Sequence, residues 1–184
     1  MADAEAICEA VQRLTMRLVA VKSEETQGAA TVFRVREILI RQKTQAIHAL
    51  RGHLTQFGQL VPQGAANASR LFAIVEDPDN GLPANARPAL TALSVALAHL
   101  EAEIGKLDAE IARLAKENDV ARRLMTVPGI GPLIATAIAV LSPPPKILRK
   151  ARDFAAWLGL VPRQYSTGGK QRLGTMTQMG ERSL

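Results

Sequence analysis

An unbroken heptad pattern of apolar residues in the middle of the chain most strongly limits what it can fold into. The spacing alternates between three and four residues over about four heptads: Leu90, Leu93, Leu97, Leu100, Ile104, Leu107, Ile111 and Leu114. This spacing is typical of an α-helix that buries one stripe against another helix. The stripe must therefore pack either against the same helix of a second subunit or against another long helix of its own chain.

A second long helix, expected over residues 26–57, offers such a partner within the chain. It has an apolar face, and basic residues crowd much of the rest of its surface. Its length matches that of the heptad helix, so an antiparallel hairpin and a dimeric coiled coil both satisfy the pattern. Because aromatic residues make up only 3% of the sequence, strands are disfavoured and a mainly helical fold is expected.

Shorter segments complete the expected architecture. Helices are indicated over residues 3–18, 67–76, 133–141 and 152–158 by apolar periodicity and by the Gly and Pro residues that end them. From Val161 onward, many Gly, Thr and Ser residues predict extended or irregular structure. The fold class is mainly α, with a long helical hairpin or coiled coil followed by a small helix-hairpin-helix domain with a basic irregular tail.

Positive charge gathers at the C-terminal end. From Lys146 onward there are eight basic residues and only two acidic ones, so this segment holds the whole net charge of +6. Such asymmetry favours a polyanion-binding end, although a basic tail that only aids solubility would show it too. The chain has one cysteine, Cys8, which excludes an internal disulfide. No secretory signal precedes the first helix, so a cytoplasmic location is expected.

A membrane-spanning segment is not expected. Residues 124–145 carry no charge, but Pro and Gly residues interrupt the run. The uninterrupted apolar piece, residues 133–141, is much shorter than the roughly 20 residues that a membrane span needs. A buried helix is the better interpretation.

The segment Pro128-Gly129-Ile130-Gly131-Pro132 predicts a tight turn between two helices and resembles the hairpin of a helix-hairpin-helix motif. Glycines let the backbone turn sharply and approach another chain closely. The helix that follows presents unpaired N–H groups, which bind phosphate oxygens. Ile130 is expected to pack inward between the helices. The turn is therefore a candidate DNA contact, and a plain elbow in a helical core is the alternative.

A second candidate is the loop Ser166-Thr167-Gly168-Gly169-Lys170, with Arg172 close by. It is not a P-loop, because the Gly-x-x-x-x-Gly-Lys-Ser/Thr spacing is absent. A loop with two hydroxyls and two cations can bind a phosphate passively. It can also offer a hydroxyl as a nucleophile on phosphorus, with the cations stabilising charge on the phosphate oxygens.

These motifs together resemble the transposases of the IS110 family of bacterial insertion sequences, in particular its IS1111 branch. The resemblance rests on residues 128–132, 154–170 and 172–174, which occur in the family's order, and on residues 2–10, which resemble the end of its N-terminal domain. It implies a DNA recombinase that cuts and rejoins strands through a serine nucleophile. On that basis Ser166 is our choice of nucleophile, as the only serine of the loop, and Thr167 is the alternative position.

The resemblance also implies three parts and a metal. Residues 1–22 correspond to a remnant of a resolvase-like N-terminal domain, 23–119 to a coiled-coil region and 120–184 to a helix-hairpin-helix transposase domain. The family's Asp-Glu-Asp-Asp quartet binds Mg²⁺, and only Asp3 matches it, as the fourth acid. We therefore expect a copy truncated at both ends that is inactive alone in strand exchange.

The implied partners are DNA, a guide RNA encoded by the element, and a second copy of the chain through the coiled coil. Two other functions compete with a transposase. One is a non-catalytic helix-hairpin-helix DNA-binding protein, and the other is a coiled-coil dimerisation protein whose basic tail is incidental. Retention on DNA that weakens steeply with salt distinguishes DNA binding from dimerisation alone.

Overall fold

The computed structural model describes residues 2–13, 21–64, 67–143, 147–148 and 150–180. Its elements in chain order are α1 (Ala2–Gln12), α2 (Glu24–Gln56), α3 (Ala68–Glu76), α4 (Arg87–Glu117), α5 (Asp119–Leu124), α6 (Pro132–Leu141), α7 (Ala151–Trp157), β1 (Pro162–Gln164) and β2 (Leu173–Met176). The predicted mainly helical fold is confirmed. Residues 14–18 of the first predicted helix lie outside the described residues.

The chain divides into two compact units. One consists of residues 1–28 and 140–182, and the other of residues 29–139 and 183–184. These units do not follow the three parts that the family resemblance implies, and those parts stay a prediction. The larger unit contains the long helices, whereas the smaller one contains α1, α7 and the two strands.

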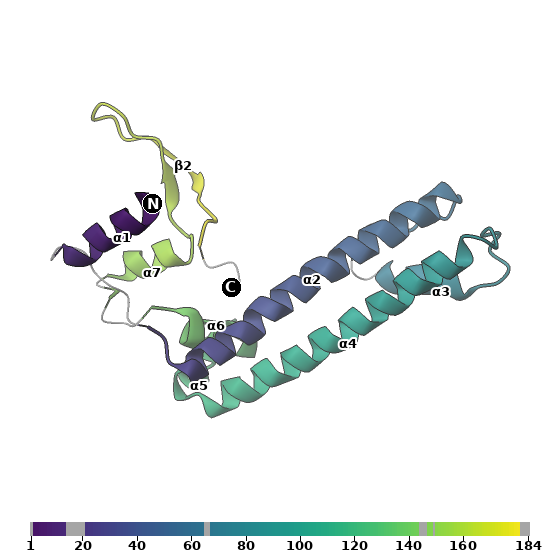
Figure 1. Cartoon of the computed structure of the whole chain (residues 1–184), viewed down its shortest axis with the longest axis horizontal. Helices are drawn as coiled ribbons and strands as arrows, with labels where there is room; N and C mark the ends of the chain where they lie inside the picture. Colours follow the sequence, from purple (N-terminus) through teal and green to yellow (C-terminus); the bar gives the residue numbers. More distant parts are fainter. Residues whose placement is uncertain (1, 14–20, 65–66, 144–146, 149, 181–184) are drawn as a thin grey trace. The chain divides into compact units, whose positions relative to one another are not determined.

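The long helices α2 and α4 form an antiparallel hairpin within the chain (Figure 1). Two ion pairs fix how they align. Arg36 Nε lies 2.5 Å from Asp108 Oδ1, and Lys43 Nζ lies 2.9 Å from Glu101 Oε1. A step of seven residues forward on α2 therefore matches a step of seven residues back on α4, which is one heptad on each helix.

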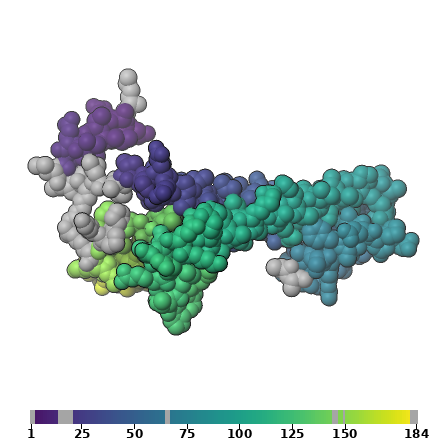
Figure 2. Space-filling view, turned by 90° about the horizontal axis from the view of Figure 1, so that it is seen from below, coloured from purple at the N-terminus to yellow at the C-terminus, as the bar shows by residue number. Residues whose placement is uncertain are grey.

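The heptad stripe of α4 is buried at alternate positions. Leu90, Leu97, Ile104 and Ile111 are buried, whereas the four leucines between and after them are only partly buried. The ion-pair register sets the buried residues of α2 at matching levels, with Leu54 near Leu90. Figure 2 shows the atoms of the two helices packed along each other. The intrachain hairpin is thus confirmed, and pairing with a second subunit stays a prediction.

A larger apolar cluster lies where α3 packs against the hairpin. Its buried members come from α2, α3, α4 and the connecting segments: Leu50, Leu54, Val61, Leu71, Val75, Leu82, Leu90 and Leu97. Each of these leucines and valines removes apolar surface from water, which contributes about 25 cal/mol for every Å² buried. This cluster anchors the short helix α3 to the two long ones.

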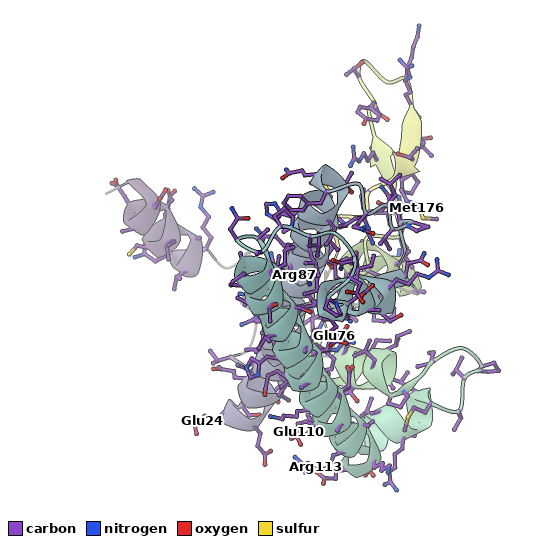
Figure 3. The ribbon with its side chains drawn as sticks, turned by 90° about the vertical axis from the view of Figure 1, so that its right-hand side faces the viewer. Glu24, Glu76, Arg87, Glu110, Arg113 and Met176 are labelled. Carbon is purple, nitrogen blue, oxygen red and sulfur yellow. The ribbon has the colours of Figure 1, made fainter. Side chains whose placement is uncertain are left out.

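Arg87, at the start of α4, holds the turn that leads into that helix (Figure 3). Its guanidinium donates to the carbonyl oxygens of Asp77 and Pro78 at 2.9 and 2.6 Å and to Asn80 Oδ1 at 2.9 Å. Asn80 in turn donates to the carbonyl oxygen of Ile74. The predicted turn cluster therefore exists, and side chains satisfy the backbone groups that it leaves without helical partners.

The C-terminal end of α6 is capped by a lysine from a distant part of the chain. Lys22 Nζ donates to the carbonyl oxygens of Val140 and Leu141 at 3.0 and 3.1 Å. Those carbonyls belong to the last turn of α6, where the helix dipole favours a cation. This contact lies within the smaller unit and joins its two chain segments.

The segment after Val161 is more regular than the sequence indicates. Strands β1 and β2 pair antiparallel, with Pro162 opposite Met176 and Gln164 opposite Leu173, and the register shifts by one residue between these pairs. Of the two forms expected after Val161, extended or irregular, the structure has the extended one, paired as a β-hairpin, which we call the basic hairpin (residues 162–176). Its formation depends on a two-residue Gly-Gly turn, which is a strong local hairpin signal.

One buried polar group in α6 gives a test of the packing. Thr136 is fully buried, and its Oγ1 has no hydrogen-bond partner among the described residues. We expect Thr136→Val to raise the free energy of unfolding by about 1 kcal/mol, because it removes an unsatisfied buried hydroxyl. Thr55→Val is the matched control, since the Thr55 hydroxyl donates to the carbonyl of Arg51 on an exposed surface. Urea unfolding measures both, and a destabilised Thr136→Val variant would contradict this packing.

Candidate nucleic-acid interface

The Pro-Gly-Ile-Gly segment forms a type II turn between α5 and α6. Ile130 N donates to the carbonyl oxygen of Val127 at 3.1 Å. Pro128 takes the second position of the turn, and Gly129 takes the third with φ of +88°. That conformation is the one a type II turn needs at this position, and glycine adopts it without strain. The predicted tight turn between two helices is present.

Helices on both sides of this turn have defined starts. The side chain of Asn118 accepts a hydrogen bond from Ala121 N at 3.0 Å and so caps α5. Pro132 is the first residue of α6, where its missing N–H costs nothing. Ile130 is partly buried, as expected for a residue that packs between the helices. The first N–H groups of α6 stand next to the turn, and their contact with DNA stays a prediction.

Two arginines close to this turn were not among the DNA-binding residues predicted from the sequence. Arg122 and Arg123 of α5, with Asp119 and Thr126, line an open depression of about 470 Å³. Arg122 is ion-paired with Asp119, whereas Arg123 has no ion pair with any residue in the described part of the chain. In the sequence, two adjacent arginines just before the Pro-Gly turn could have indicated this site, although they lie outside the C-terminal cluster of basic residues.

The basic hairpin has a defined register up to its tip. Tyr165 N donates to the carbonyl oxygen of Arg172 at 2.8 Å, and Lys170 N donates to that of Thr167 at 3.1 Å. Gly168 and Gly169 form the turn, both with positive φ, as a type I′ turn requires. Thr167 lies opposite Lys170 in an antiparallel bridge. The loop predicted over residues 166–170 is thus the end of a paired ribbon.

Alternation along this ribbon sorts its side chains onto two faces. Directly opposed residues share a face, and neighbours along a strand point to opposite faces. Thr167 therefore shares a face with Lys170, and Tyr165 shares it with Arg172. We call this the cationic face; it consists of Arg163, Tyr165, Thr167, Lys170, Arg172 and Gly174. Ser166 belongs to the other face, with Gln164, Gln171 and Leu173.

The hydroxyl of Ser166 has a structural partner. Its Oγ accepts a hydrogen bond from Arg172 N at 3.2 Å, in the place where a regular ladder would use a backbone carbonyl. Thr167, by contrast, has only backbone hydrogen bonds among the contacts of the described residues. Both residues are exposed. The strand register places Thr167 opposite Lys170 and on the same face as Arg172, whereas the Ser166 Oγ contacts the backbone of Arg172.

The two cations of the loop are available to a ligand. Lys170 and Arg172 are exposed, and within the described residues their side chains make no ion pair. The basic hairpin contains three cations and no acidic residue. Their charge is therefore not neutralised locally, which favours an anionic partner.

Comparison with known proteins is consistent with that chemistry. Residues 121–184, which include the type II turn and the whole basic hairpin, match the model of the Transposase IS116/IS110/IS902 family. This segment belongs to the IS116/IS110/IS902 transposase family. The predicted family resemblance is confirmed.

Similarity to curated transposases extends over the whole chain. A Pseudomonas aeruginosa protein named "Probable family 20 transposase" is 41% identical over 184 residues, covering 99% of this chain and 54% of that protein. The transposase for insertion sequence element IS1328 of Yersinia enterocolitica is 36% identical, covering 99% of this chain and 54% of the relative. The transposase for element IS1111A of Coxiella burnetii is 31% identical, with 97% and 49% covered. The chain thus spans about half the length of these relatives, and no solved structure matches it.

The Mg²⁺ site that the family resemblance implies is not assembled by the described residues. Asp3 is exposed at the start of α1. In the ranges that the structure describes, no three His, Cys, Asp or Glu side chains gather as metal ligands would. Asp3 therefore stays a predicted ligand. None of the described helices is both long and apolar enough to cross a membrane.

The turn conformation gives a second test. A Cβ at residue 129 would meet no atom within 4 Å, so only the positive φ opposes a side chain there. We expect Gly129→Ala to lower the free energy of unfolding by about 1–2 kcal/mol through left-handed backbone strain. Gly105→Ala is the control with opposite sign, because Gly105 lies inside α4 with nothing within 4 Å and ordinary helical φ; it should stabilise by about 0.5–1 kcal/mol. Equal changes in the free energy of unfolding for the two variants, measured by urea unfolding, would contradict a left-handed backbone at Gly129.

Proposed function

We propose that this chain acts in DNA transposition, as the part of a transposase that grips DNA and supplies the hydroxyl nucleophile. The observation that carries the proposal is the cationic face of the basic hairpin, within the segment that belongs to the transposase family. A hydroxyl and unpaired cations on one face suit attack on a phosphodiester. The similarity to insertion-sequence transposases over the whole chain supports the same function.

The chemical step is a transesterification. The hydroxyl oxygen of the hairpin forms a bond to phosphorus, and the bond from phosphorus to one strand-end oxygen breaks. The hydroxyl proton passes to solvent, and the departing oxygen takes up a proton. Lys170 and Arg172 stabilise the negative charge on the non-bridging oxygens, which is greatest in the transition state. Rejoining is the reverse step with the hydroxyl of another strand.

The hairpin offers two hydroxyls for this step. Ser166 is the choice from residue chemistry, and its Oγ accepts from Arg172 N. Thr167 lies directly opposite Lys170 and on the same face as Arg172. Cross-strand neighbours of this kind have Cβ atoms about 4.5–5.5 Å apart, close enough for both side chains to reach one phosphate. This face arrangement favours Thr167 as the attacking hydroxyl.

DNA grip is assigned to the turn between α5 and α6. We infer that the N–H groups of the first turn of α6 and the guanidinium of Arg123 bind backbone phosphates. Such contacts position a duplex without reading its sequence. This part of the proposal would hold for a non-catalytic DNA-binding protein too, because the turn and the arginine do not depend on the hairpin hydroxyls.

Further partners rest on the family resemblance alone. A guide RNA encoded by the element, a second copy of the chain paired through the long helices, and Mg²⁺ bound with the help of Asp3 are proposals of this kind. The partly exposed leucines of α4 are compatible with a second copy.

The DNA grip is tested by Arg123→Ala. We expect weaker binding to duplex DNA and a salt slope smaller by about one unit, because one phosphate contact is lost. Arg113→Ala is the control, since Arg113 is held by Glu110 and Glu117 on α4. Fluorescence anisotropy over a salt series measures both variants. Binding that does not respond to salt, or equal losses in the two variants, would contradict a phosphate contact by Arg123.

The nucleophile is tested with an oligonucleotide that carries a p-nitrophenyl phosphodiester. This leaving group departs without an acid, so the test does not depend on a metal site. We expect release of p-nitrophenol and a covalent adduct that mass spectrometry maps to residues 166–167. Thr167→Val should abolish the adduct, and Ser166→Ala should leave it.

Thr175→Val is the matched control, because it removes an exposed hydroxyl from β2 of the same ribbon and should leave the adduct unchanged. Loss of the adduct in Ser166→Ala alone would retain the proposed function but reject the face assignment. No adduct on either residue would contradict a hydroxyl nucleophile in this hairpin.

A further inference from the structure

The cationic face of the basic hairpin also presents an aromatic ring. Tyr165 is the only tyrosine of the chain, and it is 58% exposed. At this exposure more than half of the residue's surface is open to solvent and available to a ligand. The proposed chemistry does not use the ring.

The ring is held in place by the opposite strand. A Cβ at Gly174 would lie 2.7 Å from Tyr165 Cε2 and 3.4 Å from its Cδ2, so the ring rests against the glycine backbone. Any side chain at residue 174 would displace it. Covering a strand glycine with a cross-strand aromatic fixes the ring while much of it stays open to solvent.

Cations surround this ring on its own face. Arg172 is directly opposite Tyr165 in the ladder, and Lys170 is opposite Thr167, the next position on the face. Arg163 is close on the other side, with its Cβ 3.6 Å from the Cβ position of Gly174. The face therefore carries one aromatic ring with three positive charges around it, and the hairpin has no acidic residue to neutralise them.

We propose that this face binds an unpaired DNA strand, with one base stacked on Tyr165 and the adjoining phosphates held by Arg172 and Lys170. Aromatic stacking combined with cations along the backbone is how proteins bind single strands. A base inside a duplex is already stacked on both sides and cannot offer its face to the ring. This inference rests on the proposed function, since it names an unpaired strand beside the cleaved phosphate as the substrate of the same face.

The first test measures anisotropy of labelled single-stranded DNA of about 12 nucleotides, within the usual site size. We expect Tyr165→Ala and Tyr165→Leu to weaken binding at least about fivefold, because base stacking is lost. Tyr165→Leu keeps an apolar side chain over Gly174, so it tests the loss of stacking even if Tyr165→Ala unfolds the hairpin. Tyr165→Trp should bind as well as the unmodified chain or better. Leu173→Ala, on the other face of the ribbon, is the matched control and should change nothing.

A spectroscopic test reports stacking directly. In the double variant Trp157→Phe with Tyr165→Trp, the only tryptophan stands at residue 165. Trp157 stacks on Phe154 with ring centroids 5.6 Å apart, and phenylalanine keeps that aromatic pair. We expect single-stranded DNA to quench the emission of this tryptophan, and a duplex of the same sequence to leave it nearly unchanged.

Three results would overturn the inference: unchanged single-strand binding in Tyr165→Ala and Tyr165→Leu, equal losses for duplex and single strand, or tighter binding of single-stranded RNA of the same sequence. The adduct experiment separates this failure from failure of the proposed function. An adduct with no stacking would retain the nucleophile and reject the unpaired strand. Stacking without an adduct would retain the single-strand site and reject the nucleophile.

Discussion

Burial of the α4 stripe against α2 is the interaction on which the larger unit depends. The alternate heptad residues of α4 meet α2 in a register fixed by Arg36 with Asp108 and Lys43 with Glu101. Single surface ion pairs add little stability, about 0–1 kcal/mol each, so the apolar seam holds the hairpin and the pairs select its alignment. The helix α3 packs against this frame, and α5 follows directly from its end.

In the smaller unit, cross-strand pairing has the same organising role. The Gly168-Gly169 turn sets the register of the basic hairpin, and the register decides which side chains face the same way. One residue of slip would exchange Thr167 for Ser166 beside Lys170. The functional account therefore depends on a geometric property of the ribbon more than on the presence of a serine, a lysine and an arginine in one loop.

Much of this could be predicted from the sequence. The helices, the Pro-Gly turn and the family follow from periodicity, glycine and proline placement, and spaced motifs. The partner of the heptad stripe could not be chosen, because both a dimer and an intrachain hairpin bury the same residues. The hairpin was missed because its strands are short and exposed and so show no alternation of buried and exposed positions, although Gly168-Gly169 was the available signal. Arg123 was missed because the net charge of a long segment does not reveal two arginines beside one turn.

The most direct test of the central claim is the register of residues 164–173, measured by cross-strand proton contacts in NMR spectra of the intact chain. The account predicts a contact between the amide protons of Thr167 and Lys170, which form a hydrogen-bonded pair. It also predicts a contact between the α-protons of Ser166 and Gln171, which form a non-hydrogen-bonded pair. Contacts that pair Ser166 with Lys170 would contradict it, because Ser166 would then share the cationic face.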